Sequence, residues 1–375
     1  MRAHPSAAIC LGRVTPTVPL SRPIYQLGVV KERAITGNQK PNAPASRRVD
    51  GETVADVGEF GVIDRATAGR RQPDTTLVGP GDDAALVRAA DGRVAVSTDM
   101  LVEGRHFRLD WSTPEAVGRK AIAQNAADVA ALGARPTAFV VALGCPSHTP
   151  ATVLDELSDG IGCAAEELGA GVVGGDLVQA EHIVVSITVL GDLEGRAPVR
   201  RSAAQPGDVV AIAGQTGMSA AGLALLASVG RSRAVELYPE LVAAHQVPTP
   251  PYDLAYAAAR GGVHAMTDVS DGLLADLRHI ADASGVQIVL HDSAVPIVSD
   301  DSAFIPPLLS DAAQFLDANP MTWMLTGGED HAFAAAFDPS TPLPAGWRPI
   351  GTVRDGHGIV APMHDTESGG WHSFQ

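Results

Sequence analysis

The chain has 375 residues and a formal net charge of −16, and 45% of its residues are hydrophobic while only 4% are aromatic. This length predicts about two domains, and the acidic balance argues against nucleic acid or an anionic membrane surface as a main partner, because clustered Lys and Arg bind phosphate groups. No Gly-Lys-Ser or Gly-Lys-Thr occurs, which excludes a P-loop, and no apolar run reaches the ~18 residues of a membrane span.

Residues 1–54 differ in composition from the rest of the chain. They are rich in Pro, Arg, Ser and Thr, and their first acidic residue is Glu32. We expect a disordered or misassigned N-terminal extension here, with an organelle transit peptide as the alternative. The three cysteines, Cys10, Cys145 and Cys163, form no Cys-x-x-Cys and predict neither a disulfide framework nor a zinc site. This cysteine usage fits a reducing cytosol, so we expect a cytoplasmic protein.

The pattern after residue 57 predicts strands that alternate with long helices. We expect helices over residues 59–68, 114–132 and 150–168, and strands over residues 93–97, 138–143, 171–173 and 183–190. Ser112 or Thr113 is the predicted cap of the second helix and Gly133 its stop signal, whereas Thr149 is the predicted cap of the third. Residues 97–99 and 174–176 are then expected at strand ends.

Residues 196–206 are predicted to cross into a second domain, which gives an N-terminal domain over 55–195 and a C-terminal domain over 196–375. In the second domain we expect strands over residues 208–213, 263–267, 286–290 and 331–337, and helices over residues 217–229, up to 259, and after 272. The last of these helices carries an apolar stripe at Leu273, Leu274, Leu277 and Ile280. The run 214–217 resembles an anion nest, but we interpret it as turn structure.

Five acidic clusters stand out, each with an Asp beside Gly, Ser, Thr or Asn at the end of an apolar run. They are residues 79–83, 97–99, 125–128, 174–176 and 268–271. Carboxylate oxygen is the ligand that Mg²⁺ prefers, and Mg²⁺ usually brings phosphates with it, so a magnesium–nucleotide site is the leading hypothesis. The alternatives are turn acids, and a helix cap at Ser270. Lys120, one of only three lysines, is expected on a helix surface.

The ordered set of motifs resembles the thiamine-monophosphate kinase family, within the superfamily of aminoimidazole ribonucleotide synthetase and selenophosphate synthetase. The resemblance covers residues 56–375. The motifs are Glu59-Phe60, Gly79-x-Gly-Asp-Asp83, Ser97-Thr98-Asp99, residues 120–133, Gly174-Gly175-Asp176, Asp268-x-Ser-Asp-Gly272 and Gly327-Gly328-Glu329-Asp330. The resemblance implies a two-domain α+β fold with mixed and antiparallel sheets flanked by helices, and a homodimer built through the N-terminal domain.

The resemblance also implies a reaction: ATP and thiamine monophosphate give ADP and thiamine diphosphate, with several Mg²⁺ ions and K⁺ as a further candidate cation. The implied metal ligands are Asp83, Ser97, Thr98, Asp99, Asp128, Asp176, Asp268 and Asp271. The implied ATP contacts are Gly175, Asp176, Arg201 and Ser270. The implied substrate contacts are His106, Glu329 and Trp371. The chain has His331 where the family often has Tyr, and Trp371 where some members have Tyr.

These residue types suit phosphoryl transfer between two anions. Cations between the phosphates offset their repulsion, and a phosphate nucleophile, with its second pKa at ~6, needs no general base, so we expect direct in-line transfer without a phosphoenzyme. Arg201 suits a phosphate, Trp371 is a candidate to face the cationic thiazolium, and Glu329 is a candidate acceptor or charge. The alternatives are another ATP-using enzyme of the superfamily and a non-catalytic nucleotide-binding scaffold. A selenophosphate-forming enzyme is disfavoured, because Cys10 lies in the extension.

Overall fold

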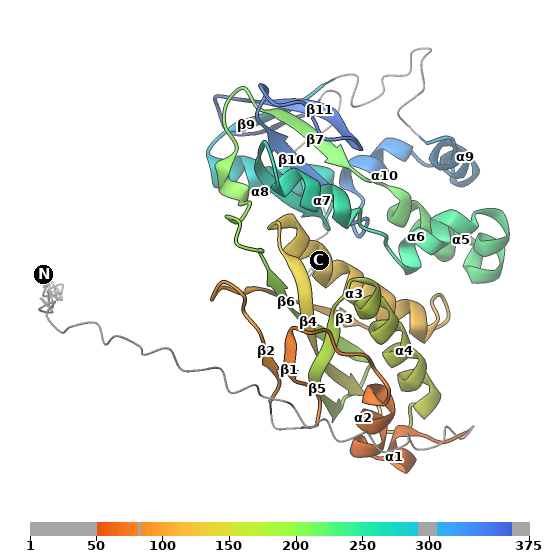
Figure 1. The fold of residues 1–375 in the computed structure, drawn as a ribbon. Coiled ribbons are helices and arrows are strands. Elements are labelled where there is room, and N and C mark those ends of the chain that lie inside the picture. The colour runs from red at the N-terminus through yellow and green to blue at the C-terminus, as the bar shows by residue number, and fades with distance from the viewer. Residues whose placement is uncertain (1–50, 82–83, 292–305, 362–375) are drawn as a thin grey trace, which may run out of the picture. The chain divides into compact units, whose positions relative to one another are not determined.

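The structure, a computed structural model, describes residues 51–81, 84–291 and 306–361. A four-stranded sheet forms the first half of the described chain, in the order β3-β6-β4-β5 (Figure 1). Its strands are β3 (Ala95–Val102), β4 (Arg135–Cys145), β5 (Gly171–Gln179) and β6 (Val184–Asp192). Only β4 and β5 pair in parallel, so the sheet is mixed, as predicted. Strands β1 (Thr76–Val78) and β2 (Leu86–Val87) form a separate two-stranded antiparallel sheet.

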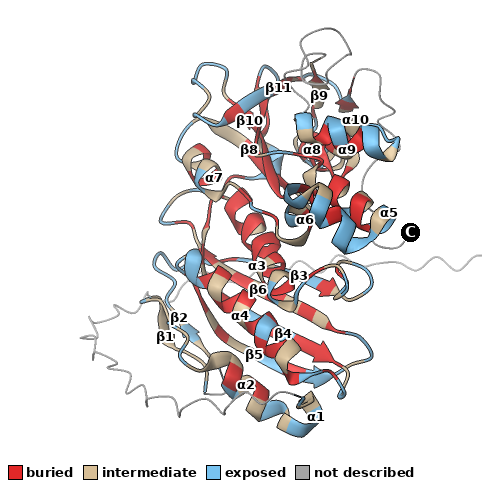
Figure 2. Cartoon of the chain, turned by 90° about the vertical axis from the view of Figure 1, so that its right-hand side faces the viewer, coloured by how far each residue is buried: buried red, intermediate tan, exposed pale blue. Residues whose placement is uncertain are grey.

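Two long helices, α3 (Pro114–Ala131) and α4 (Ala151–Glu167), pack together with their buried residues in the same core as the inward residues of this sheet. The short helices α1 (Val54–Val57) and α2 (Glu59–Thr67) precede them, and α2 packs on α4. The other face of the sheet is open, with Val96 60% exposed, Met100 51% and Val178 55%. Figure 2 shows buried residues along α3 and exposed patches on the strands.

Local chemistry explains both ends of α3. The Thr113 side chain accepts a hydrogen bond from the Ala116 backbone N–H, Pro114 occupies the first turn, and Gly133 follows the helix with φ at +85°. These are the start and stop signals that the sequence predicts. The predicted cap of α4 is wrong, because the residue before that helix is Pro150 and no side chain caps it. The first backbone N–H of the helix, that of Ala151, donates instead to the Glu52 backbone oxygen at 2.8 Å.

A six-stranded sheet, in the order β12-β9-β11-β7-β10-β8, forms the second half. Its strands are β7 (Val209–Ala213), β8 (Val263–Val269), β9 (Gln287–Leu290), β10 (Ala332–Phe337), β11 (Trp347–Arg354) and β12 (Gly358–Val360). Its helices are η1 (Arg201–Ala203, a 3-10 turn), α5 (Met218–Leu237), α6 (Pro239–Gln246), α7 (Tyr252–Ala259), α8 (Leu273–Ser284), α9 (Pro307–Leu316) and α10 (Pro320–Thr326). The sequence did not predict α6, α9, α10, β11 or β12, but the apolar stripe of α8 is buried as expected. Only β12 and β9 pair in parallel.

Helix α3 is shared between two cores. Its residues Val117 and Ile122 pack with the four-stranded sheet, whereas Ala127 and Ala130 pack in a cluster with Phe333 of β10. A helix that is apolar on all sides is one that is buried on all sides. The small side chains along α3 therefore let it lie between the two sheets, which places its polar residues at the junction.

The predicted α+β class with mixed sheets is confirmed. The predicted domain boundaries at residues 55–195 and 196–375 remain a prediction, and most of the predicted extension, residues 1–50, lies outside the described residues. No helix in the described ranges is both long enough and apolar enough to cross a membrane.

Candidate active site

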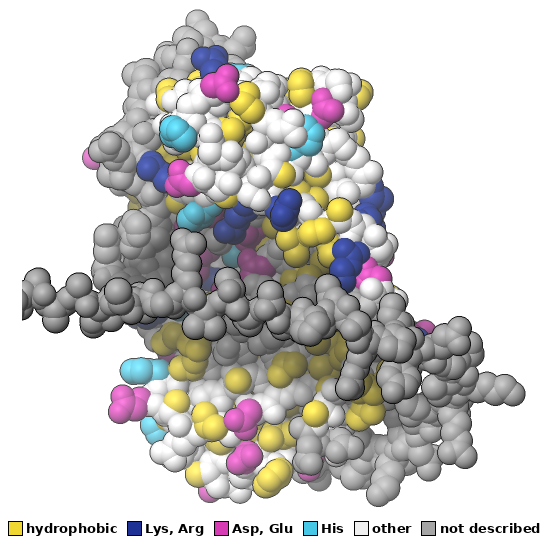
Figure 3. Space-filling model, turned by 90° about the vertical axis from the view of Figure 1, so that its left-hand side faces the viewer, with side chains coloured by type: hydrophobic (Ala, Val, Ile, Leu, Met, Phe, Trp, Pro, Cys, Tyr) yellow, Lys and Arg dark blue, Asp and Glu magenta, His cyan; other side chains and the backbone are white. Residues whose placement is uncertain are grey.

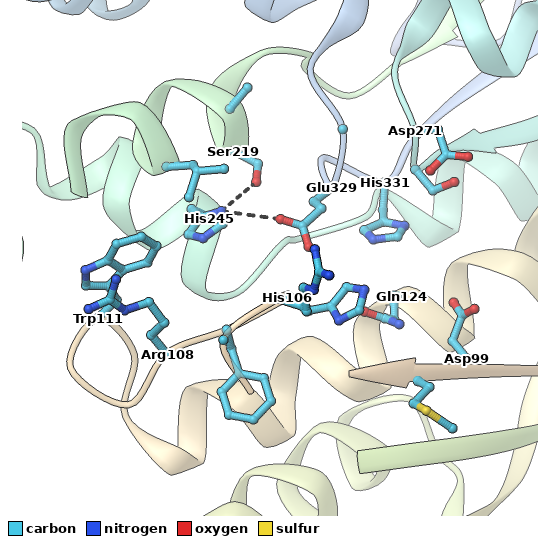
Figure 4. A pocket seen from close by; sticks show the side chains of 18 residues that line it. Asp99, His106, Arg108, Trp111, Gln124, Ser219, His245, Asp271, Glu329 and His331 are labelled. Carbon is cyan, nitrogen blue, oxygen red and sulfur yellow. Dashed lines mark hydrogen bonds and ion pairs between the residues drawn. The ribbon is translucent and has the colours of Figure 1, made fainter. Parts of the chain in front are cut away.

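A cavity of about 620 Å³ lies where α3 and β3 face the second half of the chain (Figure 4). Residues from both halves line it: Asp99 of β3, the loop 104–111, and the segments that hold Ser219, His245, Ser270–Asp271 and 328–331. Acidic, basic and histidine side chains gather in a hollow of the face shown in Figure 3. The cavity is thus lined by charged and titratable groups from segments that are far apart in the sequence.

Strand β3 and helix α3 hold the first acids of the cavity. Ser97 Oγ donates a hydrogen bond to Asp128 Oδ2 at 2.6 Å, and the Asp99 backbone N–H donates to Asn125 Oδ1 at 3.0 Å. Residues 97–99 were predicted at a strand end, but β3 continues to Val102. The prediction failed because Asp is disfavoured within strands, whereas here α3 supplies polar partners to the side of the strand that carries Ser97 and Asp99.

Asp268, on β8, approaches the same acids from the other sheet. It is only 2% exposed. Burial and then repulsion from Asp268 raise the pKa of Asp128 to about 7, and burial with repulsion from Asp268 and Asp271 raises the pKa of Asp99. A charge shifts a neighbour's pKa strongly only at short range, so Asp99, Asp128, Asp268 and Asp271, four of the predicted metal ligands, converge. Like charges held in a poorly solvated site are the arrangement in which a divalent cation is most stabilising.

Asp276, an acid that the sequence analysis did not single out, holds the segment after β8 through hydrogen bonds to its backbone. Its Oδ2 accepts hydrogen bonds from the backbone N–H groups of Asp271 at 3.0 Å and Gly272 at 3.2 Å. The alternative considered for Ser270, a helix cap, does not hold: the residue before α8 is Gly272, with no side-chain cap. Burial, followed by repulsion from Asp268, raises the pKa of Asp276 to about 7. Donor atoms of Asp271, Asp276 and His279 lie within 4.8 Å of one another.

His331 contacts the acids directly. Its Nδ1 lies 3.0 Å from Asp268 Oδ2, and the residue is 4% exposed. Burial alone would lower its pKa, but the hydrogen bond and the attraction of Asp268 outweigh burial and raise it. Asp268 therefore has a histidine partner in addition to its neighbouring carboxylates.

Glu329 also lines the cavity, and Figure 4 shows its side chain beside that of His245. Lys120 Nζ lies 2.9 Å from Glu329 Oε1, and His245 Nδ1 lies 3.5 Å from Glu329 Oε2. Lys120 was predicted on a helix surface, but it is 2% exposed. That prediction was wrong because an amphipathic pattern is absent from α3, so its sequence does not show which side chains are covered. Burial opposes the charge of Glu329, but attraction to Lys120 and His245 lowers its pKa overall.

His106, the other predicted substrate contact in the described chain, also lines the cavity. Its Nδ1 accepts a hydrogen bond from the Val102 backbone N–H at 3.1 Å, and its backbone oxygen accepts from Lys120 Nζ at 3.1 Å. A neutral imidazole that accepts at Nδ1 carries its proton on Nε2. His106 can therefore donate from Nε2.

Other predicted site residues lie away from this cluster. Thr98 Oγ1 donates to the Ile187 backbone oxygen at 2.9 Å, and strand alternation directs it to the open face of the sheet. Gly175 and Asp176 are exposed on β5, at the sheet edge opposite β3, and lie within that strand rather than at its end. Arg201 Nε donates to Thr267 Oγ1 at 3.1 Å and does not line the cavity. Asp83 and Trp371 lie outside the described residues.

The side chain of Asp330 occupies the N-terminus of α5, next to the turn 214–217. Asp330 accepts hydrogen bonds from the backbone N–H groups of Gly217 at 2.6 Å and Ser219 at 2.8 Å. The interpretation of this run as turn structure agrees with that contact, because the carboxylate fills the position that an anion would take. Burial raises the pKa of Asp330 to about 7, although these N–H groups oppose the shift.

Comparison with known proteins agrees with this geometry. The family models for the AIR synthase related protein match the chain, the N-terminal domain over residues 81–193 and the C-terminal domain over residues 205–360. The thiamine-monophosphate kinase of Mycobacterium tuberculosis is 55% identical to the chain, over 88% of this chain and 95% of its own length. The chain belongs to the thiamine-monophosphate kinase family.

Other members of the thiamine-monophosphate kinase family extend the likeness. The protein of Corynebacterium glutamicum is 41% identical, over 87% of this chain and 96% of its own length. The crystal structure of the Stenotrophomonas maltophilia enzyme matches with a TM-score of 0.67 at 28% identity, over 80% of this chain and 93% of that one. The structure of AaThiL complexed with AMPPCP and TMP matches with a TM-score of 0.68 at 29% identity, over 88% and 100%. The predicted family is thus confirmed.

Proposed function

We propose that the protein transfers the γ-phosphoryl group of ATP to the phosphate of thiamine monophosphate, giving ADP and thiamine diphosphate. One observation carries the proposal: Asp99, Asp128 and Asp268 converge beside a cavity, in a chain 55% identical to a thiamine-monophosphate kinase. The solved relative complexed with AMPPCP and TMP supports the same pair of substrates.

The carboxylates fit Mg²⁺. They are oxygen donors, and the repulsion of Asp268 on both Asp99 and Asp128 is what a divalent cation between these acids would offset. Asp99, Asp128, Asp268 and Asp271 would hold the ions, with Ser97 positioning Asp128. Bound there, Mg²⁺ would supply positive charge between the phosphates. Asp83, Thr98 and Asp176 remain predicted ligands, and K⁺ remains a candidate cation.

The residues of the chain bind and orient rather than exchange protons. The attacking phosphate oxygen is already anionic near neutral pH, so the cavity needs no general base and transfer is direct and in line. His106 donates from Nε2 to the substrate, and Glu329 accepts from it. Arg201, Gly175, Asp176 and Ser270 remain the predicted contacts of ATP, of which Ser270 lines the cavity. Trp371 remains the predicted contact of the thiazolium.

The working molecule in this proposal is a homodimer in the cytoplasm. Large apolar side chains from three strands are exposed on the open face of the four-stranded sheet: Val96 and Met100 of β3, Val140 of β4 and Val178 of β5. Several large apolar side chains exposed on one sheet face are typical of a protein interface. The free thiols of Cys145 and Cys163 fit a reducing compartment.

A coupled assay of ADP release tests the proposal. Thiamine monophosphate should support turnover with stoichiometric formation of thiamine diphosphate, whereas free thiamine and aminoimidazole ribonucleotide precursors should not. Turnover with a precursor instead would favour another activity of the superfamily. Binding of Mg·ATP without turnover of any substrate would favour a non-catalytic scaffold.

A further inference from the structure

The carboxylate of Glu329 belongs to a network of four side chains from four segments of the chain. Lys120 comes from α3, Ser219 from α5, His245 from α6, and Glu329 from the turn before β10. Ser219 Oγ lies 3.1 Å from His245 Nδ1, which in turn lies 3.5 Å from Glu329 Oε2 (Figure 4). Lys120 Nζ completes the network at 2.9 Å from Glu329 Oε1.

Of the two charged residues in this network, Glu329 lines the cavity and Lys120 does not. The side chain of Glu329 is 30% exposed, whereas that of Lys120 is 3% exposed. The ammonium group therefore lies behind the carboxylate as seen from a substrate. Burial and the nearby Lys120 lower the pKa of His245 to about 4, so His245 is neutral near pH 7. The network then carries one positive and one negative charge.

The backbone holds Glu329 in a conformation that its own preferences disfavour. Its φ is +66°, and its N–H donates to the Ser270 backbone oxygen at 2.7 Å. The preceding Gly328 is packed so closely that an added Cβ would lie 2.5 Å from the same oxygen. A non-glycine residue in the left-handed region is uncommon and typical of functional positions. The carboxylate is thus aimed by the turn and then clamped by Lys120 and His245.

We infer that Lys120 and His245 are positioning residues that turn Glu329 into an oriented, charge-compensated hydrogen-bond acceptor for the amino group of the substrate's pyrimidine, rather than an anion that attracts its thiazolium. This inference rests on the proposed function. A compensated pair presents little net charge to a cation, but the lone pairs of its carboxylate keep their direction. A site of this kind rejects an analogue that lacks the matching donor, because its buried acceptor is left unpaired.

The direct test compares thiamine monophosphate with the analogue whose pyrimidine amino group is replaced by oxygen. The wild-type protein should favour the amino substrate by at least about 100-fold in kcat/KM. In Glu329→Gln, the amide oxygen remains the partner of Lys120, so the amide NH₂ faces the cavity. That variant should lose the preference or reverse it, whereas Glu115→Gln, at an exposed glutamate of α3, should keep it.

A second variant tests Lys120 itself. Lys120→Met should raise KM for thiamine monophosphate by about 10-fold or more, leave KM for ATP within about 2-fold, and weaken the preference for the amino substrate. The matched control is Arg119→Met, because the adjacent Arg119 pairs with Glu115 and Glu167 outside the cavity. If Lys120→Met does not fold, Glu329→Gln alone decides the question.

The outcomes separate the inference from the function on which it rests. A wild-type protein that does not turn over thiamine monophosphate overturns the proposed function. Turnover with equal kcat/KM for the two substrates, or an amino preference unchanged in Glu329→Gln, overturns the hydrogen-bond inference alone. An unchanged substrate KM in a folded Lys120→Met overturns the positioning role of Lys120.

Discussion

Ser97 Oγ and Asp128 Oδ2 lie 2.6 Å apart, and this hydrogen bond joins the first strand of the four-stranded sheet to the helix that both sheets share. The bond orients Asp128 toward Asp99 and Asp268, the neighbours that raise its pKa. The acids are thus held by regular secondary structure. Rigid placement of this kind is what a metal-assisted phosphoryl transfer requires.

Asp128→Asn separates the electrostatic role of this acid from its structural one. Because its folded pKa of about 7 lies above the unfolded value of 3.8, the stability of the metal-free fold falls as pH rises between these two values, and the loss is complete above the folded pKa. In EDTA near pH 8, the variant should melt at the same temperature as the wild type or higher. In Mg·ATP, it should gain less stability than the wild type, and kcat should fall by at least about 100-fold.

Thermal unfolding with and without Mg·ATP, together with the ADP-release assay, measures these effects. Asp64→Asn, at an exposed acid of α2, is the matched control and should change neither. A variant that lost stability in EDTA but kept its activity would contradict the assigned role.

His245→Asn should change how stability depends on pH. The folded pKa of about 4 lies below the unfolded value of ~6.5, so the unfolded chain binds a proton that the folded chain does not over this window. The neutral His245 therefore contributes stability that is fully present above the unfolded pKa of ~6.5 and is lost as pH falls toward the folded pKa of about 4. Between about pH 7.5 and pH 5 the wild type should lose about 2 kcal/mol more than the variant.

Urea unfolding at several pH values provides the comparison, since the other titrating groups cancel in the difference. His148→Asn, at an exposed histidine, should behave like the wild type. Parallel pH profiles for wild type and His245→Asn would show that His245 is not held neutral.

Asp330→Ala should weaken the start of α5. The carboxylate is the partner of two backbone N–H groups, those of Gly217 and Ser219, and alanine leaves both without an acceptor. The expected loss in unfolding free energy is about 2–4 kcal/mol. Asp311→Ala, at an exposed position of α9, should lose little. Equal unfolding curves for the two variants would rule out the capping role of Asp330.

Val96→Glu should dissociate the proposed homodimer. Val96 is 60% exposed on the open sheet face, and a buried unpaired carboxylate at an interface is strongly unfavourable. Light scattering coupled to gel filtration should show the mass of two chains for the wild type and of one chain for the variant. Val235→Glu, at a valine of α5 that is 41% exposed, should remain a dimer. A dimer that survives Val96→Glu uses another surface.

The sequence predicts elements well where the signals are local. Both ends of α3 follow from Thr113, Pro114 and Gly133, because caps and stops act within a few residues. The buried stripe of α8 follows from its period. The motif order also led to the family, which the comparisons confirm.

Features that depend on distant partners were missed. The strand β3 continues through Asp99 because Asn125 and Asp128 meet its polar groups from α3. Lys120 is buried because Glu329 and the His106 carbonyl, far along the chain or in a loop, accept from its ammonium group. His245 carries no local motif at all. Helix propensity and spacing do not report such long-range pairing.

The most direct measurement of the central claim is the binding of Mn²⁺, a paramagnetic substitute for Mg²⁺ at oxygen ligands, to the full chain with AMPPCP and thiamine monophosphate. Electron paramagnetic resonance should show protein-dependent binding in the wild type and weaker binding by about 10-fold or more in Asp99→Asn and Asp268→Asn, with Asp64→Asn unchanged. Equal Mn²⁺ affinity in all four proteins would contradict the claim that these converging acids hold the metal.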